Sequence, residues 1–411
     1  MGESITVNGE RLLRRLAELA KIGATPKGGV TRLAFTDLDK QGRDLFVRWC
    51  KEIGLAVRID EMGNIFARYG SSEGAPVMSG SHLDSQPTGG KYDGAYGVIA
   101  ALESINTLID QGIEPKRPIE VVNWSNEEGS RFAPSMVGSG VYAGVFSLDY
   151  AYARENREEG VTQGAEIARI GYRGGVPCKT GPLHRYFELH IEQGPVLEEK
   201  KLRVGVVEGV FGIQWLEITI AGSQNHAGST PMEGRRDPMM AAAEIIAGAD
   251  SLPTKHAGAD GRLTVGCAWL KPNSVNVIPG EARFTVDIRG KTLDKLERIV
   301  TAFRELAGSV AKRRKVGLEI KELSNIAPVT FEKSCCDTVE EVTREFQLSY
   351  QRMHSGPGHD AVFISKIAPT GMIFVPSIGG ISHAEIENTA PEDLIAGCNV
   401  LANTLLRSAN G

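Results

Sequence analysis

The stretch APVMSGSHLDSQPTGGKYDGAYGVIAALESINTLIDQG, residues 75–112, begins as a short apolar run that ends in His82. A glycine-rich segment follows, and then an apolar, helix-forming segment closed by a glycine. A second apolar run, IEVVNWSNEE at 119–128, again ends in ionisable residues. Strand, helix and strand at this spacing predict a parallel or mixed sheet covered by helices. In such sheets functional side chains gather at the carboxyl ends of the strands, where His82 and the pair Glu127–Glu128 are expected.

Toward the middle of the chain the pattern changes to that of a compact inserted unit. Residue periodicities predict strands and helices in the order β-α-β-β-α-β, which is typical of a ferredoxin-like fold. These elements are expected at 213–223, 238–250, 262–270, 281–290, 292–314 and 316–323. The stretch GMIFVPSIGGISH, residues 371–383, then returns to a strand that leads to a candidate ligand. We therefore expect an α/β protein with a mixed-sheet catalytic domain at 1–210 and 328–411, interrupted by a lid domain at 211–327.

Composition restricts the classes of function. The chain of 411 residues has a formal net charge of −5 and scattered basic residues, so nothing favours nucleic-acid binding. No apolar run approaches the ~18 residues needed to span a bilayer, so no membrane partner is expected. The N-terminal stretch predicts an amphipathic helix capped by Asn8 rather than a signal peptide, and the six cysteines include no C-x-x-C pair. We expect a cytoplasmic protein with reduced thiols.

Five residues at expected strand or loop ends are candidate metal ligands: His82, Asp93, Glu128, His190 and His383. A single histidine is most often a hydrogen-bonded packing or surface residue. That interpretation weakens for His82, because the flanking glycines allow the backbone to approach a ligand closely. A purely structural role is also disfavoured for the two glutamates of NEEG, since adjacent buried carboxylates repel each other unless a cation lies beside them. One carboxylate could then bind a divalent cation while the other accepts a proton from water.

Three other residues have competing interpretations. Asp84, two residues after His82, has the spacing of a side chain that accepts the second N–H of the imidazole, although a solvated loop aspartate is equally compatible. Arg289 could bind a substrate carboxylate in a bidentate fork or pair with Asp287, and the residue pattern alone favours the pair. His226, near an expected hairpin end, is on its pattern alone a surface histidine.

Seven stretches, taken together and in order, resemble the di-metal aminoacylase and carboxypeptidase superfamily. They are most similar to its branch of N-carbamoyl-L-amino-acid hydrolases, β-ureidopropionases and allantoate amidohydrolases. The stretches are GSHLDSQPTGGKYDGAYGV, NWSNEEGSRF, ELHIEQGPVLE, NHAGSTPMEGRRD, PNSVNVIPGEARFTVDIR, SGPGHDA and GISH, spread from about residue 79 to 383. The resemblance therefore covers nearly the whole chain and implies a metal-dependent hydrolase.

The resemblance implies a role for each candidate ligand. His82 and His190 would bind one metal ion, Glu128 and His383 would bind the other, and Asp93 would bridge both. Two divalent ions per subunit are implied, either Zn²⁺ or one of Mn²⁺, Co²⁺ and Ni²⁺. Exopeptidase members usually carry a carboxylate at the position of His190, so a histidine inside HIEQGP indicates the carbamoyl-hydrolysing branch.

The same resemblance implies the remaining site residues. Glu127 would be the general base toward the attacking water and would pass the proton to the leaving nitrogen. His226 would stabilise the developing oxyanion, acting from the lid of the partner subunit. The residues expected to bind the substrate, chiefly its carboxylate, are Gln193, Asn276, Arg289 and His359.

The implied reaction is hydrolysis of the ureido C–N bond of an N-carbamoyl-L-amino acid or of N-carbamoyl-β-alanine, giving the amino acid, CO₂ and ammonia. Allantoate is the alternative substrate, because MHSGPGHDA and SIGGISH resemble allantoate amidohydrolases at least as closely. An aminoacylase or dipeptidase is a third choice, which His190 disfavours. A catalytically silent binding protein is disfavoured because every expected ligand and Glu127 are present. The expected protein partner is a second copy of the chain, in a homodimer formed through the lid domain.

Overall fold

The computed structural model describes residues 4–71, 73–156, 158–179 and 181–411. It divides into two compact units. The first contains the chain up to Glu208, Phe331–Met353 and Pro357–Gly411, and the second contains Gly209–Thr330 and His354–Gly356. The divisions after residues 208 and 330 lie two and three residues from the positions expected from the sequence, and the segment 354–356 of the second unit was not expected. The role of the second unit as a lid stays a prediction.

The first unit is built on one large mixed sheet, as expected. Its strands follow the order β1-β2-β4-β3-β7-β18-β8, and β17 also pairs with β8. Strands β4, β3, β7 and β18 are parallel neighbours, whereas β1, β2 and β8 run antiparallel to theirs. The strand bounds are β1 Ala56–Ile59, β2 Ile65–Tyr69, β3 Val77–His82, β4 Ile119–Trp124, β7 Arg185–Ile191, β8 Val204–Val210, β17 Tyr350–Ser355 and β18 Thr370–Val375. Parallel neighbours place the carboxyl ends of β3, β4, β7 and β18 along one edge.

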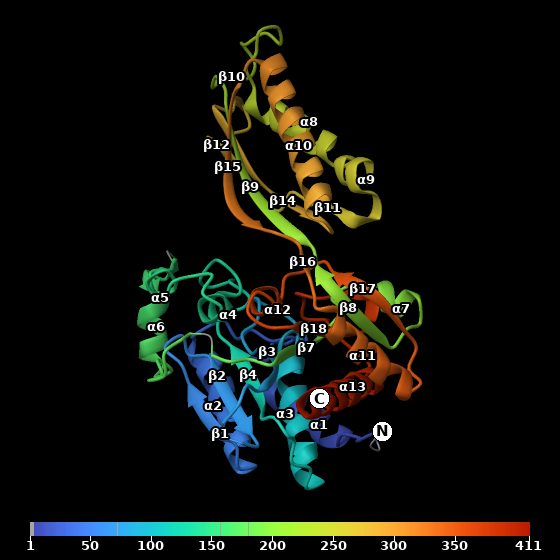
Figure 1. Ribbon diagram of the computed structural model, residues 1–411. Helices are drawn as coiled ribbons and strands as arrows, with labels where there is room; N and C mark the ends of the chain where they lie inside the picture. The colour runs from blue at the N-terminus through green and yellow to red at the C-terminus, as the bar shows by residue number, and fades with distance from the viewer. Residues whose placement is uncertain (1–3, 72, 157, 180) are drawn as a thin grey trace. The chain divides into compact units, whose positions relative to one another are not determined.

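Helices cover this sheet, and α3 and α13 pack against each other and against its central strands (Figure 1). The helix α1 begins after Asn8, whose side chain accepts the Arg11 N–H at 3.0 Å, as the cap predicted from the sequence requires. The helices of the first unit are α1 Gly9–Leu19, α2 Asp37–Glu52, α3 Ala95–Asp110, α4 Val137–Tyr142, α5 Leu148–Tyr152, α6 Gln163–Arg169, α7 Val196–Glu199, α11 Lys333–Glu345, α12 Ala361–Ile364, the 3₁₀ turn η2 Ile378–Gly380 and α13 Pro391–Asn410. Two short strands, β5 Glu155–Asn156 and β6 Val161–Thr162, pair with each other.

The second unit has its own sheet, ordered β11-β14-β9-β15, with β12 also paired to β14. Its major elements follow the order β9, α8, β11, β14, α10, β15, which is the expected β-α-β-β-α-β series (Figure 1). Buried residues of α8 and α10, among them Ile245, Ile299 and Phe303, form one core with the sheet. The bounds are β9 Gly212–Ala221, β10 Asn225–His226, α8 Pro238–Ala249, α9 Leu252–Ala257, η1 Gly258–Asp260, β11 Gly261–Thr264, β12 Ala268–Lys271, β13 Val277–Ile278, β14 Glu281–Gly290, α10 Leu293–Arg314, β15 Gly317–Ile326 and β16 Val329–Thr330, which pairs with residues 209–210.

One expected element of the second unit is wrong. The stretch 262–270 was expected to be a single strand, but the structure has β11 and β12 with residues 265–267 between them. Thr264 lies opposite Asp287 while Ala268 lies opposite Phe284, so four steps on one strand match three on the other. One extra residue therefore interrupts the pairing with β14, as in a β-bulge.

Other features of the chain agree with its composition. Among the described residues, no helix is both long and apolar enough to cross a bilayer. All six cysteines are free, and all but Cys267 are buried. Burial raises the pKa of the Cys50 thiol to about 12, so this cysteine is a packing group rather than a reactive thiolate.

Candidate metal centre

The carboxyl edge of the parallel strands gathers the candidate ligands of the first unit. His82 is the last residue of β3, and His190 lies near the end of β7. Glu127 and Glu128 follow β4, and Asp93 directly precedes the turn into α3. The strands β3, β4 and β7 are adjacent and parallel. Their carboxyl ends, at residues 82, 124 and 191, are therefore neighbours in space.

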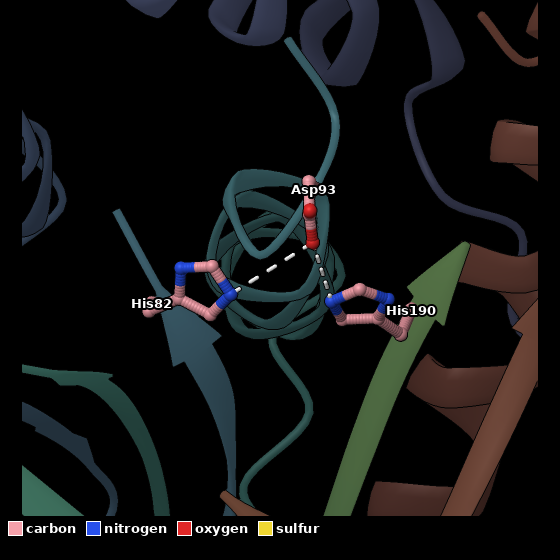
Figure 2. A group of neighbouring side chains, drawn as sticks. All are labelled: His82, Asp93 and His190. Carbon is pink, nitrogen blue, oxygen red and sulfur yellow. Dashed lines mark ion pairs between the residues drawn. The ribbon is translucent and has the colours of Figure 1, made fainter. Parts of the chain in front are cut away.

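Asp93 lies between two histidines, as Figure 2 shows. Its Oδ1 is 3.2 Å from His190 Nε2 and 3.9 Å from His82 Nε2. One ligand atom from each of the three residues falls within 4.8 Å of the others, so this buried group could hold a metal ion. The sequence therefore identified three residues that the fold brings together.

The second oxygen of Asp93 faces a different histidine. Asp93 Oδ2 is 3.2 Å from His383 Nε2, and that nitrogen is 3.6 Å from Glu128 Oε2. These three residues form a second group that could hold a metal ion. The loop that carries His383 contains Gly379 and Gly380 at φ 65° and 64°, which lets the chain bend sharply after β18. Asp93 is thus shared between two candidate sites.

Hydrogen bonds orient both buried imidazoles toward Asp93. His82 Nδ1 lies 2.8 Å from the Asp84 carbonyl oxygen, and His190 Nδ1 lies 2.9 Å from the Ile191 carbonyl oxygen. A carbonyl only accepts, so each Nδ1 carries a proton, and in the neutral ring Nε2 then presents a lone pair. This is the tautomer that a metal ligand of this kind needs.

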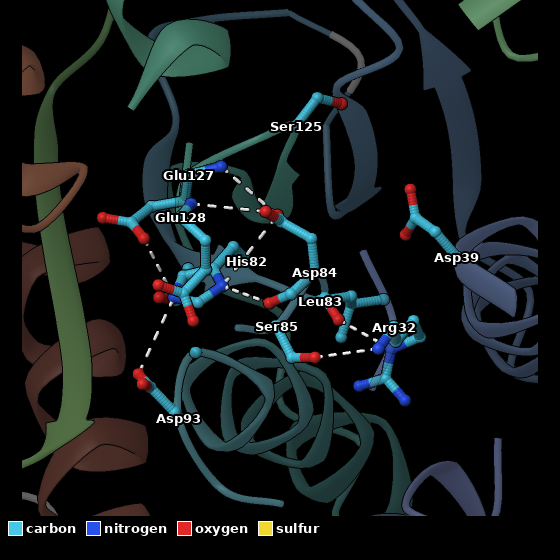
Figure 3. Close-up of polar contacts among 12 residues, drawn as sticks. Arg32, Asp39, His82, Leu83, Asp84, Ser85, Asp93, Ser125, Glu127 and Glu128 are labelled. Atoms are coloured by element: carbon cyan, nitrogen blue, oxygen red, sulfur yellow. Dashed lines mark hydrogen bonds and ion pairs between the residues drawn. The ribbon is translucent and has the colours of Figure 1, made fainter. Parts of the chain in front are cut away.

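The expected role of the Asp84 carboxylate is wrong. Its Oδ1 is 4.0 Å from His82 Nδ1, too far for a hydrogen bond, and the backbone carbonyl of Asp84 takes that role. The carboxylate instead accepts the backbone N–H groups of Glu127 and Glu128, each at 3.2 Å (Figure 3). The side chain reaches past the imidazole because the loop after β3 runs alongside the loop after β4. Asp84 is therefore a buried residue that holds the Glu127–Glu128 backbone.

Burial is the main cause of the perturbed pKa values of Glu127, Glu128 and His82. It raises the pKa of Glu127 well above its usual range, and the charge of Asp360 adds to the shift. The pKa of Glu128 rises to about 8, first through burial and then through Asp93. Burial lowers the pKa of His82 to about 4 and keeps its imidazole neutral. Contacts with Asp93 instead raise the pKa values of His190 and His383 to about 9. Crowded carboxylates beside imidazole nitrogens are the groups that a divalent cation stabilises, so the donor set fits metal binding.

Glycine 94 is required by this geometry. Its φ is 64°, and a Cβ placed there would lie 2.3 Å from the His82 ring. Any other residue would displace the imidazole or the turn that carries Asp93. The glycine-rich segment after β3 therefore lets the backbone approach the ligands closely, as predicted.

Gln193 and His359, expected to bind substrate, lie beside the same cluster. Gln193 Nε2 donates to Asp93 Oδ2 at 3.0 Å, and its φ of 57° is rare for a residue with a side chain. The ring centroids of His359 and His190 are 4.5 Å apart, and the angle between the two ring planes is 61°. Glu188, His190 and His359 form a third buried group that could hold a metal ion. The role of Gln193 and His359 in substrate binding stays a prediction.

Glu387 was not identified from the sequence. Its carboxylate accepts the N–H groups of Tyr92 and Asp93, each at 3.1 Å, and the hydroxyl of Ser382 at 2.7 Å. It therefore ties the segment that carries Asp93 to the segment that carries His383. The one available signal was its place in HAEIEN, four residues after the candidate ligand.

The expected residues of the second unit do not form one group. His226 pairs with Val277 in a short ladder, and the Asn276 carbonyl accepts the Ala227 N–H at 2.9 Å, so His226 and Asn276 lie on adjacent loops. Arg289 is near the other end of β14. It forms a fork on the Asp287 carboxylate, with Nη2 at 2.8 Å. The structure thus contains the ion pair that the residue pattern favoured.

In this mixed α/β fold, the parallel strand ends gather histidines and carboxylates around a shared aspartate. The class of protein with this fold and site is a metal-dependent hydrolase. The chain belongs to peptidase family M20/M25/M40, whose model matches residues 78–407. This confirms the superfamily expected from the sequence.

Full-length relatives place the chain more closely. It is 44% identical to the N-carbamoyl-L-amino-acid amidohydrolase of Rhizobium meliloti, over 99% of this chain and 98% of that protein. It is 34% identical to the ureidoglycolate hydrolase of Arabidopsis thaliana, over 99% and 88%. The crystal structure of an amidase of the hydantoinase/carbamoylase family from Burkholderia multivorans superposes with a TM-score of 0.92, at 49% identity and 99% coverage of both chains.

Proposed function

We propose that this protein hydrolyses the ureido C–N bond of N-carbamoyl-L-amino acids. The observation that carries the proposal is the similarity at 44% identity to the Rhizobium meliloti N-carbamoyl-L-amino-acid amidohydrolase, which spans 99% of the chain. N-Carbamoyl-β-alanine is a second substrate to test, because it has the same ureido group with its carboxylate one carbon farther from the nitrogen. The similarity to a ureidoglycolate hydrolase supports an alternative class of ureido acid as substrate, namely ureidoglycolate and allantoate.

The proposed metal ligands are the five residues of the two groups around Asp93. His82 and His190 would bind one divalent ion, Glu128 and His383 the other, and Asp93 would bridge them with its two oxygens. Support comes from the 3.2 Å contacts that Asp93 makes with His190 on one oxygen and His383 on the other. Bound divalent cations supply Lewis acidity that polarises a carbonyl group and acidifies water. Nitrogen and oxygen ligands of this kind suit Zn²⁺, Mn²⁺, Co²⁺ or Ni²⁺.

Glu127 is proposed as the general base. It is buried, and its Oε2 lies 3.4 Å from His82 Nε2, so it borders the ligand cluster without belonging to either three-residue group. Its carboxylate would accept a proton as water adds to the ureido carbon. The same group would donate that proton to the nitrogen of the amino acid as the C–N bond breaks. The carbamate released would decompose to CO₂ and ammonia.

The substrate carboxylate is proposed to bind Arg289, with Asn276, Gln193 and His359 as further substrate contacts. Arg289 is about a quarter exposed, and its Nη1 already donates to the Gly356 carbonyl at 2.9 Å. A guanidinium has five donors, so it can hold Asp287 and still offer N–H groups to a ligand carboxylate.

His226 is proposed as the donor that stabilises the oxyanion, and the second unit as the dimer contact. Between the loop of His226 and Arg289 runs most of β14, Glu281–Gly290. Eight strand steps correspond to about 27 Å, several times the length of a carbamoyl amino acid. One copy cannot offer both side chains to one substrate, so the separation supports a homodimer in which the two copies contribute different residues.

Subunit exchange tests the dimer. Mixing equal amounts of His226→Ala and Glu127→Gln proteins, differently tagged, would produce hybrid dimers with one complete site. Recovery of up to about a quarter of wild-type activity is expected for random exchange. Proven exchange without recovery would mean that His226 acts within its own chain or has no catalytic role.

A substrate panel tests the reaction. Ammonia and free amino acid would be measured with Zn²⁺ or Mn²⁺ added, on N-carbamoyl-L- and D-amino acids, N-carbamoyl-β-alanine, ureidoglycolate and allantoate. N-Acetyl amino acids and dipeptides are the matched controls for an aminoacylase or dipeptidase. The highest kcat/KM is expected for an N-carbamoyl-L-amino acid. Turnover confined to N-acetyl substrates or dipeptides would overturn the proposal.

A further inference from the structure

The loop around His226 holds its imidazole from the backbone side. His226 Nδ1 accepts the N–H of Gly228 at 3.0 Å and the N–H of Ser229 at 3.1 Å. A backbone N–H can only donate, so Nδ1 carries no proton in this arrangement. The proton of the neutral ring is then on Nε2.

An arginine closes the same loop. Arg235 Nη2 donates to the carbonyl of Ala227 at 2.8 Å and to that of Thr230 at 2.6 Å, and its Nε donates to Thr230 at 3.1 Å. Gly228 and Ser229 lie between these two anchor points in the sequence. The Thr230 hydroxyl also donates to the His226 carbonyl at 2.6 Å. Arg235 therefore bridges the residues that flank both N–H donors.

The reactive edge of the imidazole is accessible. His226 is exposed, whereas Arg235 is half-buried under the loop that it binds. A donor that is already aimed and already carries its proton needs little reorganisation when negative charge develops on a substrate oxygen. The loop thus has the features of a prepared neutral donor.

We propose that Arg235 is a positioning residue that keeps His226 as the Nε2–H tautomer. This inference rests on the proposed function of His226 as the oxyanion donor, and it adds how that donor is prepared. Arg235 itself touches no reacting atom. Its effect passes through the Ala227 and Thr230 carbonyls to the two N–H groups on Nδ1.

The neighbouring arginine provides a matched control. Arg236 has its Nε hydrogen bond on the Lys315 carbonyl, at 2.7 Å, and this bond does not involve the His226 loop. Arg235→Met and Arg236→Met remove the same charge from adjacent positions. Arg235→Lys keeps the charge but loses the fork that reaches two carbonyls.

The first readout is spectroscopic and does not depend on turnover. ¹⁵N-histidine spectra of the full-length protein near neutral pH distinguish a protonated from an unprotonated ring nitrogen. The chain has eight histidines, and the signals of His226 are those lost in His226→Asn. In the neutral ring, wild type and Arg236→Met are expected to carry the proton on Nε2 only, while Arg235→Met shows a mixture of tautomers.

The second readout separates kcat from KM on an N-carbamoyl-L-amino acid. Loss of one oxyanion donor costs about 10²–10³-fold in kcat, so a mispositioned donor in Arg235→Met should cost at least about tenfold with KM little changed. Arg235→Lys is expected between Arg235→Met and wild type, and Arg236→Met should match wild type.

The outcomes separate this inference from the proposed function. Full kcat in His226→Ala would remove the proposed role of His226, whatever its tautomer. A reduced kcat in His226→Ala, together with an Nδ1–H or doubly protonated ring in wild type, would overturn only the inference. Wild-type kcat and tautomer in Arg235→Met would also overturn it. If Arg235→Met does not fold, the wild-type tautomer and Arg235→Lys decide.

Discussion

Asp84 Oδ1 accepts a hydrogen bond from the backbone N–H of Glu127 at 3.2 Å, across 43 positions of the sequence. The other carboxylate oxygen accepts the N–H of Glu128, and the Asp84 carbonyl binds the His82 ring. One residue of the β3 loop therefore orients a candidate ligand and both glutamates of the β4 loop.

Asp84→Asn should impair the metal centre without unfolding it. The amide has one acceptor oxygen, and its NH₂ group would oppose one of the two backbone donors, so the Glu127–Glu128 backbone should shift. Changes to groups that support a ligand typically cost about 10–100-fold in metal affinity or activity. Metal affinity by titration and kcat would be measured beside Asp110→Asn, a change at an exposed ion pair. Equal values for wild type and Asp84→Asn would contradict this role.

The two adjacent glutamates should respond differently to the same change. Glu127→Gln should keep both metals and lose turnover, because an amide cannot accept the proton of water. Loss of a general base costs about 10²–10⁴-fold. Glu128→Gln should instead lower the metal content measured by elemental analysis. An exchange of the two results would mean that the base and the ligand have been assigned in the wrong order.

Removal of divalent metal should abolish activity. Dialysis against a chelator, followed by Zn²⁺, Mn²⁺, Co²⁺ or Ni²⁺ in separate samples, should restore turnover to an extent that depends on the ion. Bound metal should approach two ions per chain. Full turnover in a preparation shown to be free of metal would exclude the proposed mechanism.

Arg289 has a prediction with an internal control. If it binds the substrate carboxylate, Arg289→Lys should raise KM about tenfold or more, since lysine cannot reproduce the bidentate fork. Asp287→Asn removes its 2.8 Å ion-pair partner while keeping the guanidinium, and should change KM far less. If both variants lower thermal stability equally and leave KM unchanged, Arg289 is a structural residue.

The buried carboxyl group of Asp60 should make the stability of the protein depend on pH. Burial raises its pKa from 3.8 to about 6, although hydrogen bonds from Met62 and Asn64 oppose the shift. The fold favours the protonated acid, so this contribution is complete below about pH 4 and is lost as pH rises through 6. Two pKa units correspond to about 3 kcal/mol.

Urea unfolding at pH 4, 5, 6 and 7 would measure this contribution. The difference in unfolding free energy between wild type and Asp60→Asn should fall across that range, whatever its value at pH 4. A constant difference between wild type and Asp60→Asn would show that the carboxyl is ionised throughout.

The sequence alone predicted most of the main elements and the gathering of candidate ligands at the strand ends. Apolar runs at 75–82 and 119–128 that end in ionisable residues encode strands of a parallel sheet, and parallel order brings their carboxyl ends together. Local periodicity was sufficient to predict these strands, because the pattern of apolar and polar residues within a short segment indicates which face is buried. Local periodicity did not predict the bulge at 265–267, because an extra residue in a strand is recognised only from its pairing with the partner strand.

Only the tertiary structure decided which atoms meet. Spacing placed Asp84 beside His82 but could not show that the carbonyl binds the ring while the carboxylate crosses to the next loop. Glu387 approaches Asp93 from 294 positions away, a contact with no local signature. Hydrogen bonds between distant loops depend on how the elements pack, and packing is a property of the whole chain. For the same reason, only the structure shows that His226 pairs with Val277 beyond one end of β14, while Arg289 lies near the other end.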